Sequence, residues 1–213
     1  MTVMSYVKAI MLATGIVASG GASAQVAARD GRDRTGHLTG FVLAKADSRL
    51  QRVPDRLVTG RLDFERAYLG SIAASRVLIP RFTLLGRGNS LEIEGQFAQH
   101  FGNQDNAEAT AALVLRSGQL GVFGGVSING AWGNGVSYAF SNPRQERGDG
   151  GIRGVDTEKF QYHMSFETEI TDASAPDIHL VLRLHHRSGV YGLISSDRTG
   201  SNYLGAGLRF DLR

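Results

Sequence analysis

The segment that decides the fold is Leu180-Val181-Leu182-Arg183-Leu184-His185-His186-Arg187-Ser188. Side chains alternate between the two faces of a β-strand, so a strand here separates two different sets of residues. The even-numbered face carries three leucines followed by His186 and Ser188, whereas the odd-numbered face carries valine, arginine and histidine. A histidine and a serine at the end of an apolar stripe suit a catalytic pair whose substrate is itself a lipid.

The same alternation of apolar and polar residues recurs along the chain, for example in residues 91–97, 160–167 and 203–212. It predicts strands over residues 57–68, 70–79, 89–101, 107–117, 120–130, 132–141, 159–170, 177–188 and 201–212. Bacterial single-chain outer-membrane barrels favour even strand counts, so one of these segments is expected to be a bent half or a plug. We therefore predict an all-β fold, an antiparallel up-and-down transmembrane β-barrel of eight strands.

The N-terminal part of the chain has a different character. Residues 1–24 have the features of a secretory signal peptide, with Lys8 before a short apolar run and Ala22-Ser23-Ala24 as a cleavage site. Residues 25–56 are polar and rich in arginine, and we expect a partly flexible lead-in with one short strand near 37–43. The barrel domain is then expected to span residues 57–213.

A soluble periplasmic barrel or sandwich that carries a lipid in its interior is the alternative to a membrane barrel, because it also gives alternation but points its apolar face inward. Outside residues 1–24 no run is long and apolar enough for a membrane-spanning helix, so membrane insertion requires a closed barrel. Segments 159–170, 177–188 and 201–212 have about the ten residues that a tilted strand needs to cross a bilayer. Their polar faces suit a wet interior, and we favour the membrane barrel.

Composition excludes several function classes. The chain has no cysteine, which rules out disulfides and thiolate metal sites, and its net charge of only +3 argues against nucleic acid as a partner. His163, Glu167 and Glu169 share the inner face of one predicted strand, and His185 shares that of another. Metal binding by these residues is the alternative, but we favour a salt-bridge and polar network with barrel arginines, so that neither a metal ion nor another cofactor is predicted.

The predicted topology gives the His186–Ser188 pair a location. Bacterial barrels keep both termini on the periplasmic side, so the last strand runs inward and the strand before it runs outward. His186 and Ser188 then lie at the outer rim, against a leaflet made of lipopolysaccharide. Asn202 shares their face on the adjoining strand and is placed to orient the imidazole. The backbone N–H groups of Gly189 and Val190 are candidates for an oxyanion hole.

Basic residues of this chain are almost all arginine, which is suited to pairing with phosphate through two hydrogen bonds. Arg187 and Arg198 lie in or near predicted outer loops and are candidates for binding the phosphates of lipid A. The alternative is that such arginines merely solvate the loops.

Residues 183–189, followed by residues 200–202 and a glycine-interrupted final strand, resemble the lipid A 3-O-deacylase (PagL) family, as does the glycine-rich stretch 133–138. That resemblance implies an eight-stranded outer-membrane barrel that removes the ester-linked 3-position acyl chain of lipid A with a Ser–His–acid triad. The His-x-Ser motif of the family falls on His186 and Ser188.

The chain departs from the family pattern at two points. Gly189 stands where the family has asparagine directly after the serine, and no glutamate follows about a dozen residues later. Asn202 is the nearest match to the third residue of the triad, and Asp197 is an acidic substitute. The expected function is an outer-membrane esterase acting on lipid A. The alternative is a non-catalytic structural or lipid-binding outer-membrane barrel that has lost the acid.

Overall fold

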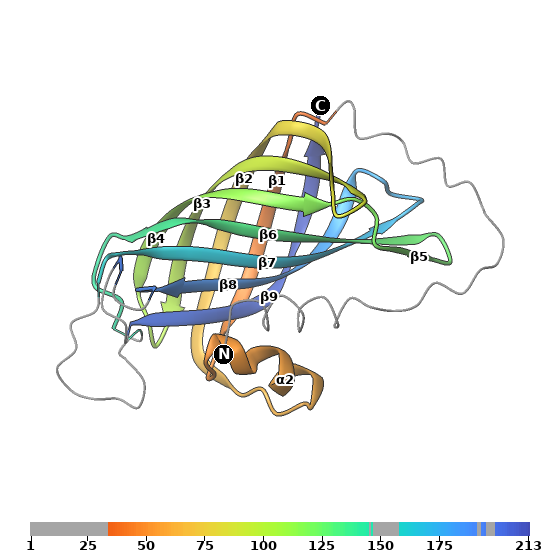
Figure 1. The fold of residues 1–213 in the computed structure, drawn as a ribbon. Coiled ribbons are helices and arrows are strands. Elements are labelled where there is room, and N and C mark those ends of the chain that lie inside the picture. Colours follow the sequence, from red (N-terminus) through yellow and green to blue (C-terminus); the bar gives the residue numbers. More distant parts are fainter. Residues whose placement is uncertain (1–33, 145, 147–157, 191–192, 195–198) are drawn as a thin grey trace.

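Eight antiparallel strands close into a barrel in the computed structural model (Figure 1), which describes residues 34–144, 146, 158–190, 193–194 and 199–213. In chain order the barrel strands are β1 (Gly36–Ala46), β2 (Phe64–Leu84), β3 (Arg87–Gly102), β4 (Asn106–Ser117), β6 (Val126–Ala139), β7 (Phe160–Asp172), β8 (Ile178–Ser188) and β9 (Gly200–Leu212). Neighbours in this order pair with each other, and β1 pairs with β9 to close the ring. The predicted fold class and strand count are confirmed.

Two short elements accompany the barrel. β5 (Gly121–Phe123) pairs only with the start of β6 and forms a small hairpin outside the ring. A 3-10 turn, η2 (Leu50–Arg52), leads into helix α2 (Val53–Val58), which has a proline in its first turn. Among the described residues, no helix combines the length and the apolar character needed to cross a lipid bilayer.

The barrel begins earlier than the sequence predicted. Residues 36–46, assigned to the lead-in with at most a short strand, form the full strand β1, which pairs along its length with β2 and β9. Alternation is masked here because the inward set includes Phe41 and Leu43 while the outward set includes Leu38 and Val42, so both faces look apolar. The prediction that the barrel domain starts at residue 57 was therefore wrong.

Two other strand boundaries also differ. The predicted strands 57–68 and 70–79 are one strand, β2, because Gly70 continues the extended backbone and does not end it. Residues 57–58, the start of the first of these predictions, belong to helix α2 (Val53–Val58). The predicted strands 120–130 and 132–141 become the short β5 and the single strand β6. The residues predicted to form a signal peptide lie outside the described part of the chain.

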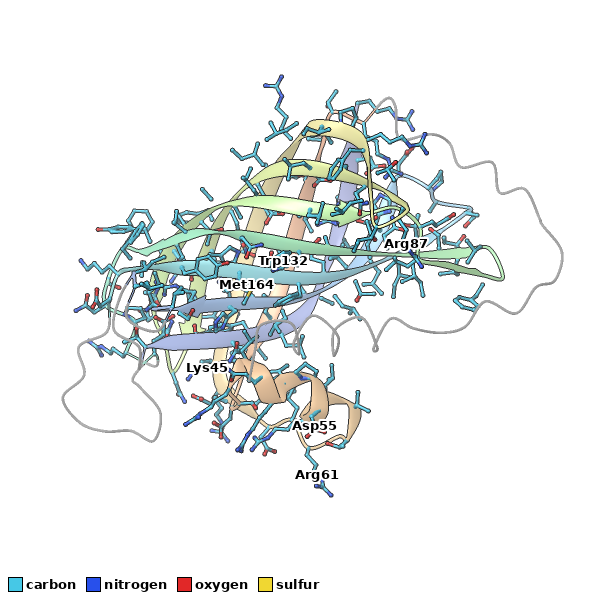
Figure 2. The ribbon with its side chains drawn as sticks, in the orientation of Figure 1. Lys45, Asp55, Arg61, Arg87, Trp132 and Met164 are labelled. Carbon is cyan, nitrogen blue, oxygen red and sulfur yellow. The ribbon has the colours of Figure 1, made fainter. Side chains whose placement is uncertain are left out.

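The outside of the barrel is apolar and the inside is charged. Leu180 and Leu182 of β8 point outward with 43% and 44% of their surface exposed, whereas Arg183 and Arg187, further along the same strand, are fully buried. Trp132 of β6 is likewise exposed, on the outer wall seen in Figure 2. An apolar exterior around a polar interior is the arrangement of a barrel surrounded by hydrocarbon. It is the reverse of what a soluble barrel requires, because such a barrel turns its apolar face inward.

Ion pairs fill the interior. Glu167 of β7 accepts hydrogen bonds from Arg116 at 3.2 Å and Arg209 at 2.8 Å, and it forms an ion pair with Arg183 at 2.9 Å. Glu169, two residues along, pairs with Arg116 and Arg209. The salt-bridge network predicted for Glu167 and Glu169 is confirmed. These pairs stabilise the buried charges, since an unpaired buried charge is strongly unfavourable.

The two ends of the barrel differ in their connections. Residues 47–63, 103–105, 140–159 and 189–199 join strands at one end, where α2 also lies (Figure 1). The opposite end carries the connections 85–86, 118–125 and 173–177, together with the start of β1 and the end of β9. Three of the four connections at the first end are longer than any connection at the end that holds the start of β1 and the end of β9. Such a difference is typical of bacterial outer-membrane barrels, with the long connections outside.

Candidate active site

His186 and Asn202 meet on the outward side of the β8–β9 pair, where Asn202 is buried with 6% of its surface exposed and His186 is half-buried. The two residues are direct partners in the antiparallel register, and their Nδ1 and Oδ1 atoms are 2.7 Å apart. Both belong to the even-numbered, outward-facing set of their strands, as predicted. His186 lies two residues before the end of β8, next to the 189–199 connection and at the end of the barrel that carries the long connections.

The contacts of Asn202 determine which imidazole nitrogen carries the proton. The Asn202 amide nitrogen donates a hydrogen bond to the backbone carbonyl of Ser48 at 2.7 Å, so the side chain cannot turn its NH₂ group toward His186. Asn202 Oδ1 therefore faces the ring as an acceptor, and His186 Nδ1 must donate. This leaves His186 Nε2 with its lone pair, which is the form that a general base needs.

Ser188 follows His186 on the same face and pairs with Gly200 of β9 and Tyr162 of β7. Its side chain is half-buried. Within the described part of the chain, no hydrogen bond joins its hydroxyl to His186. Catalytic hydrogen bonds are often long before substrate binds and tighten in the complex.

The proposed oxyanion-hole residues come directly after Ser188. Gly189 is buried, and its carbonyl accepts a hydrogen bond from the Ile194 N–H at 3.1 Å. Val190 has a φ of 51°, in the left-handed region that a branched residue rarely adopts. Backbone strain of this kind is concentrated at functional sites. The part played by the Gly189 and Val190 N–H groups stays a prediction.

Arg187 does not lie where a phosphate ligand would. Its odd number places it inside the barrel, where its guanidinium donates to Glu146 at 2.7 Å and to the backbone carbonyl of Lys159 at 3.0 Å. The side chain is fully buried, so the expectation that Arg187 binds lipid A phosphate was wrong. Arg198 and Asp197 lie outside the described residues.

Two contributors to this surface were not identified from the sequence. One is the backbone carbonyl of Ser48 in the β1–β2 connection, because no side-chain pattern signals a carbonyl. The other is Tyr162 of β7, which is the direct register partner of Ser188 in β8. Its hydroxyl donates a hydrogen bond to Asn134 Oδ1 of β6. Tyr162 could have been found by extending the register from β8 to β7, since both residues belong to the outward set.

The surroundings of the pair are apolar, which affects the substrate that it can accept. Met164, labelled in Figure 2, lies opposite His186 in the register, and Leu184 precedes His186 on the same face. A polar pair set into an apolar wall can receive an ester whose acyl chain lies along that wall. In the described part of the chain, one cluster of side chains could hold a metal ion, and it consists of Glu108, His163 and His185. These residues point into the lumen and are not part of the outward-facing site.

Comparison with known proteins gives a likeness of fold. The sequence matches no protein-family model and no curated protein. The structure is similar to the crystal structure of the outer membrane enzyme PagL, with a TM-score of 0.56 and 11% identity over 83% of this chain and 99% of that one. It also matches Neisserial surface protein A (TM-score 0.47, 12% identity, 83% of this chain and 96% of that one). A third match is LpxR from Salmonella typhimurium (TM-score 0.33, 12% identity, 76% and 61%).

At 11% identity the likeness to PagL establishes the eight-stranded barrel fold and no more. The chemistry has to be argued from the residues of this chain.

Proposed function

We propose that this protein is an outer-membrane esterase that removes an ester-linked acyl chain from lipid A. The observation that carries the proposal is the 2.7 Å contact between His186 and Asn202 on the outward face, next to Ser188. An enzyme that hydrolyses a soluble substrate would gain nothing from placing these groups on a hydrocarbon-facing wall. An enzyme whose substrate is a membrane lipid needs them there.

The outer leaflet is the proposed location of the site. The apolar exterior supports insertion into a bilayer, and the long connections at the His186 end support an outward orientation of that end. Lipid A occupies the outer leaflet of the Gram-negative outer membrane and carries its ester-linked acyl chains parallel to the barrel wall. The likeness of fold to an outer-membrane enzyme is consistent with this location.

The proposed reaction is acyl transfer to Ser188 followed by hydrolysis. Ser188 Oγ attacks the ester carbonyl carbon while His186 Nε2 takes its proton, and the resulting imidazolium returns that proton to the departing sugar oxygen. Water, deprotonated by the same nitrogen, then attacks the acyl-serine and releases a fatty acid. Asn202 holds the ring in the required tautomer throughout, and N–H groups near Gly189 would stabilise the oxyanion.

A neutral amide at position 202 limits this mechanism. Asn202 can orient the imidazole, but it cannot stabilise the imidazolium by charge as a carboxylate does. Together with the missing hydrogen bond between Ser188 and His186, this feature favours a second candidate function, a structural or lipid-binding barrel without catalysis. In that case Ser188 would have no special reactivity.

Mass spectrometry of lipid A tests the proposal. Cells expressing the wild-type protein should lose one ester-linked acyl chain from lipid A, and cells expressing Ser188→Ala should not. Ser201→Ala is a matched control, because Ser201 is on the neighbouring strand but faces the lumen and donates to Glu146. Identical acylation in wild-type and Ser188→Ala cells would contradict the esterase. A serine-directed phosphonate that labels Ser188 in the folded barrel would exclude the purely structural role.

A further inference from the structure

Three potential metal ligands meet inside the barrel, on the side of the wall opposite to the candidate active site. Glu108 of β4, His163 of β7 and His185 of β8 point into the lumen and are fully buried. One ring nitrogen of each histidine and one carboxylate oxygen of Glu108 all lie within 4.8 Å of one another. The rings of His163 and His185 have their centroids 4.5 Å apart. The cluster joins three strands from within.

The His163 side chain makes no hydrogen bond in the described structure. Neither Nδ1 nor Nε2 of its ring makes a hydrogen bond to a described residue, and the same is true of His185 Nδ1. Leaving a buried polar group unsatisfied costs about 1–3 kcal/mol, so native proteins seldom do it without a reason. Several other buried lumen atoms also make no hydrogen bond, among them the hydroxyl oxygens of Ser165 and Tyr203, but of the described histidines only His163 has neither ring nitrogen hydrogen-bonded. Either nitrogen is therefore available to a ligand, which points to a ligand that His163 is placed to bind.

Glu108 is held in position by groups around it. His100 Nε2 donates to Glu108 Oε2 at 2.8 Å, and the Ser137 hydroxyl donates to Oε1 at 2.8 Å. The Gln104 side-chain amide donates to His100 Nδ1 at 3.3 Å, which fixes the tautomer of His100. Metal ligands are usually oriented by a second layer of hydrogen bonds of this kind. A carboxylate fixed in this way loses little freedom when it binds an ion.

The spacing of the donors fits a small ion. His185 Nε2 and Glu108 Oε1 are 3.1 Å apart and form a hydrogen bond, which an ion bound between them would replace. Two ligand atoms around a tetrahedral ion are about 3.3 Å apart when each bond is about 2.0–2.1 Å long, as for zinc bound by histidine and carboxylate. A shift of the His163 ring toward this pair would complete a three-ligand set.

Charge in this part of the lumen also favours a cation. Arg187 is shared between Glu146 at 2.7 Å and Glu108 at 3.7 Å, so two carboxylates face one guanidinium. Arg183 is close as well, but it forms its own ion pairs with Glu94 and, at 2.9 Å, with Glu167. With neutral imidazoles, the group of Glu108, Glu146 and Arg187 has one negative charge in excess. A divalent ion on Glu108 would offset it.

We propose that Glu108, His163 and His185 bind a divalent transition-metal ion inside the barrel, with Zn²⁺ the best match to the donors. Two imidazoles and one carboxylate form a recognised zinc ligand set, and a water molecule would complete four-coordination. Such an ion would tie β4, β7 and β8 together near the outer end. It would act on stability, because the ligands and the outward-facing His186 and Ser188 lie on opposite sides of the barrel wall.

Cobalt and zinc titrations of the full chain, refolded in detergent and treated with chelator, test this site. One equivalent of Co²⁺ should produce the visible absorption bands of tetrahedral cobalt, Zn²⁺ should abolish them, and Zn²⁺ should raise the melting temperature. His163→Gln should weaken binding by about tenfold or more. His179→Gln is the matched control, because His179 is also a buried lumen histidine but hydrogen-bonds to Asp211 at 3.0 Å, and it should bind normally.

The absence of cobalt bands in folded wild-type protein would overturn the proposal, as would equal affinity in wild type and His163→Gln. If His163→Gln does not fold, the wild-type titration and a second variant, His185→Gln, still decide. Ser188→Ala should bind Zn²⁺ as the wild type does. Failure of the esterase therefore leaves the metal site untouched, and the two hypotheses can be judged separately.

Discussion

The side chains of Asn202 and His186 form a hydrogen bond across two adjacent strands, with 2.7 Å between Oδ1 and Nδ1. The opposite end of the Asn202 amide is bound to the carbonyl of Ser48, also at 2.7 Å. A loop backbone thus determines the orientation of the amide, and the amide determines the protonation pattern of the imidazole. This two-step link makes the β1–β2 connection part of the candidate site.

The link predicts the effect of Asn202→Ala. Without the acceptor, His186 can rotate and adopt the other tautomer, so the esterase should lose activity by about 10²-fold or more, since general-base catalysis contributes about 10²–10⁴-fold. The loss should appear in kcat and leave KM nearly unchanged. Hydrolysis of a long-chain ester by the detergent-solubilised protein measures both constants.

A matched control for this variant is Asn89→Ala. Asn89 binds backbone carbonyls of the β2–β3 turn at the opposite end of the barrel, so its removal should leave kcat within twofold. Equal kcat values for Asn202→Ala and wild type would remove Asn202 from the mechanism.

The outward leucines predict how the barrel responds to a charge on its wall. Leu182→Arg should destabilise the protein by about 2–4 kcal/mol in lipid vesicles, because it places a guanidinium in hydrocarbon. Leu57→Arg is the control, since Leu57 is even more exposed, at 52%, but lies on α2 beyond the barrel. Urea unfolding in vesicles measures both. Equal, small effects at the two positions would indicate that β8 faces water.

The ion pairs of the lumen predict a large effect of Glu167→Gln. This change leaves Arg116, Arg183 and Arg209 with one carboxylate fewer in the interior, and breaking a buried pair in this way typically costs about 3–5 kcal/mol.

Glu65→Gln provides the contrast, because the Lys45–Glu65 pair is partly exposed and should contribute about 1 kcal/mol at most. The free energy of unfolding in detergent distinguishes the two variants. A loss at Glu167 no greater than that at Glu65 would mean that the lumen is well hydrated.

The close approach of β4 and β6 predicts that Gly135 cannot be enlarged. A Cβ atom at Gly135 would overlap the Ala111 carbonyl oxygen and lie 2.6 Å from Ala112 Cα, both in the backbone of β4. Gly135→Ala should therefore destabilise the barrel by about 1–3 kcal/mol.

At Gly95 of β3, by comparison, a Cβ meets no atom within 4 Å. Gly95→Ala should be neutral, or stabilising by about 0.5–1 kcal/mol, because alanine loses less backbone entropy in a strand. Melting temperatures measured side by side would test the pair, and equal melting temperatures would contradict the close contact.

Features that depend on alternation could be predicted from the sequence. The parity of β8 and β9 put Leu182 outside and placed His186 and Asn202 on one face, and the antiparallel pairing of these two consecutive strands made them neighbours. The odd number of Arg187 also indicated the lumen, but its nearness to a loop led to the prediction of an external phosphate ligand, which was wrong. Alternation could not predict strand β1, because its two faces are similarly apolar. It also could not predict the position of the Ser48 carbonyl, which depends on the path of the β1–β2 connection.

The meeting of Glu108, His163 and His185 was equally hidden. Their numbers are far apart, and which strands face each other across the lumen depends on the number of strands and the stagger of the closed ring. Sequence patterning therefore assigned His163 to the same network as Glu167 and Glu169, its neighbours on β7. The structure separates them, with Glu167 and Glu169 among the arginines and His163 beside His185.

The strict two-residue repeat of β8 has a consequence for how this chain can change its length. Deleting or inserting a single residue within Ile178–Ser188 would exchange the two faces beyond that point, burying leucines among carboxylates and exposing arginines to acyl chains. Changes of two residues would keep the faces but slide His186 away from Asn202. Variation in length is therefore expected to accumulate in the connections 140–159 and 189–199, while the wall between them keeps a constant number of residues.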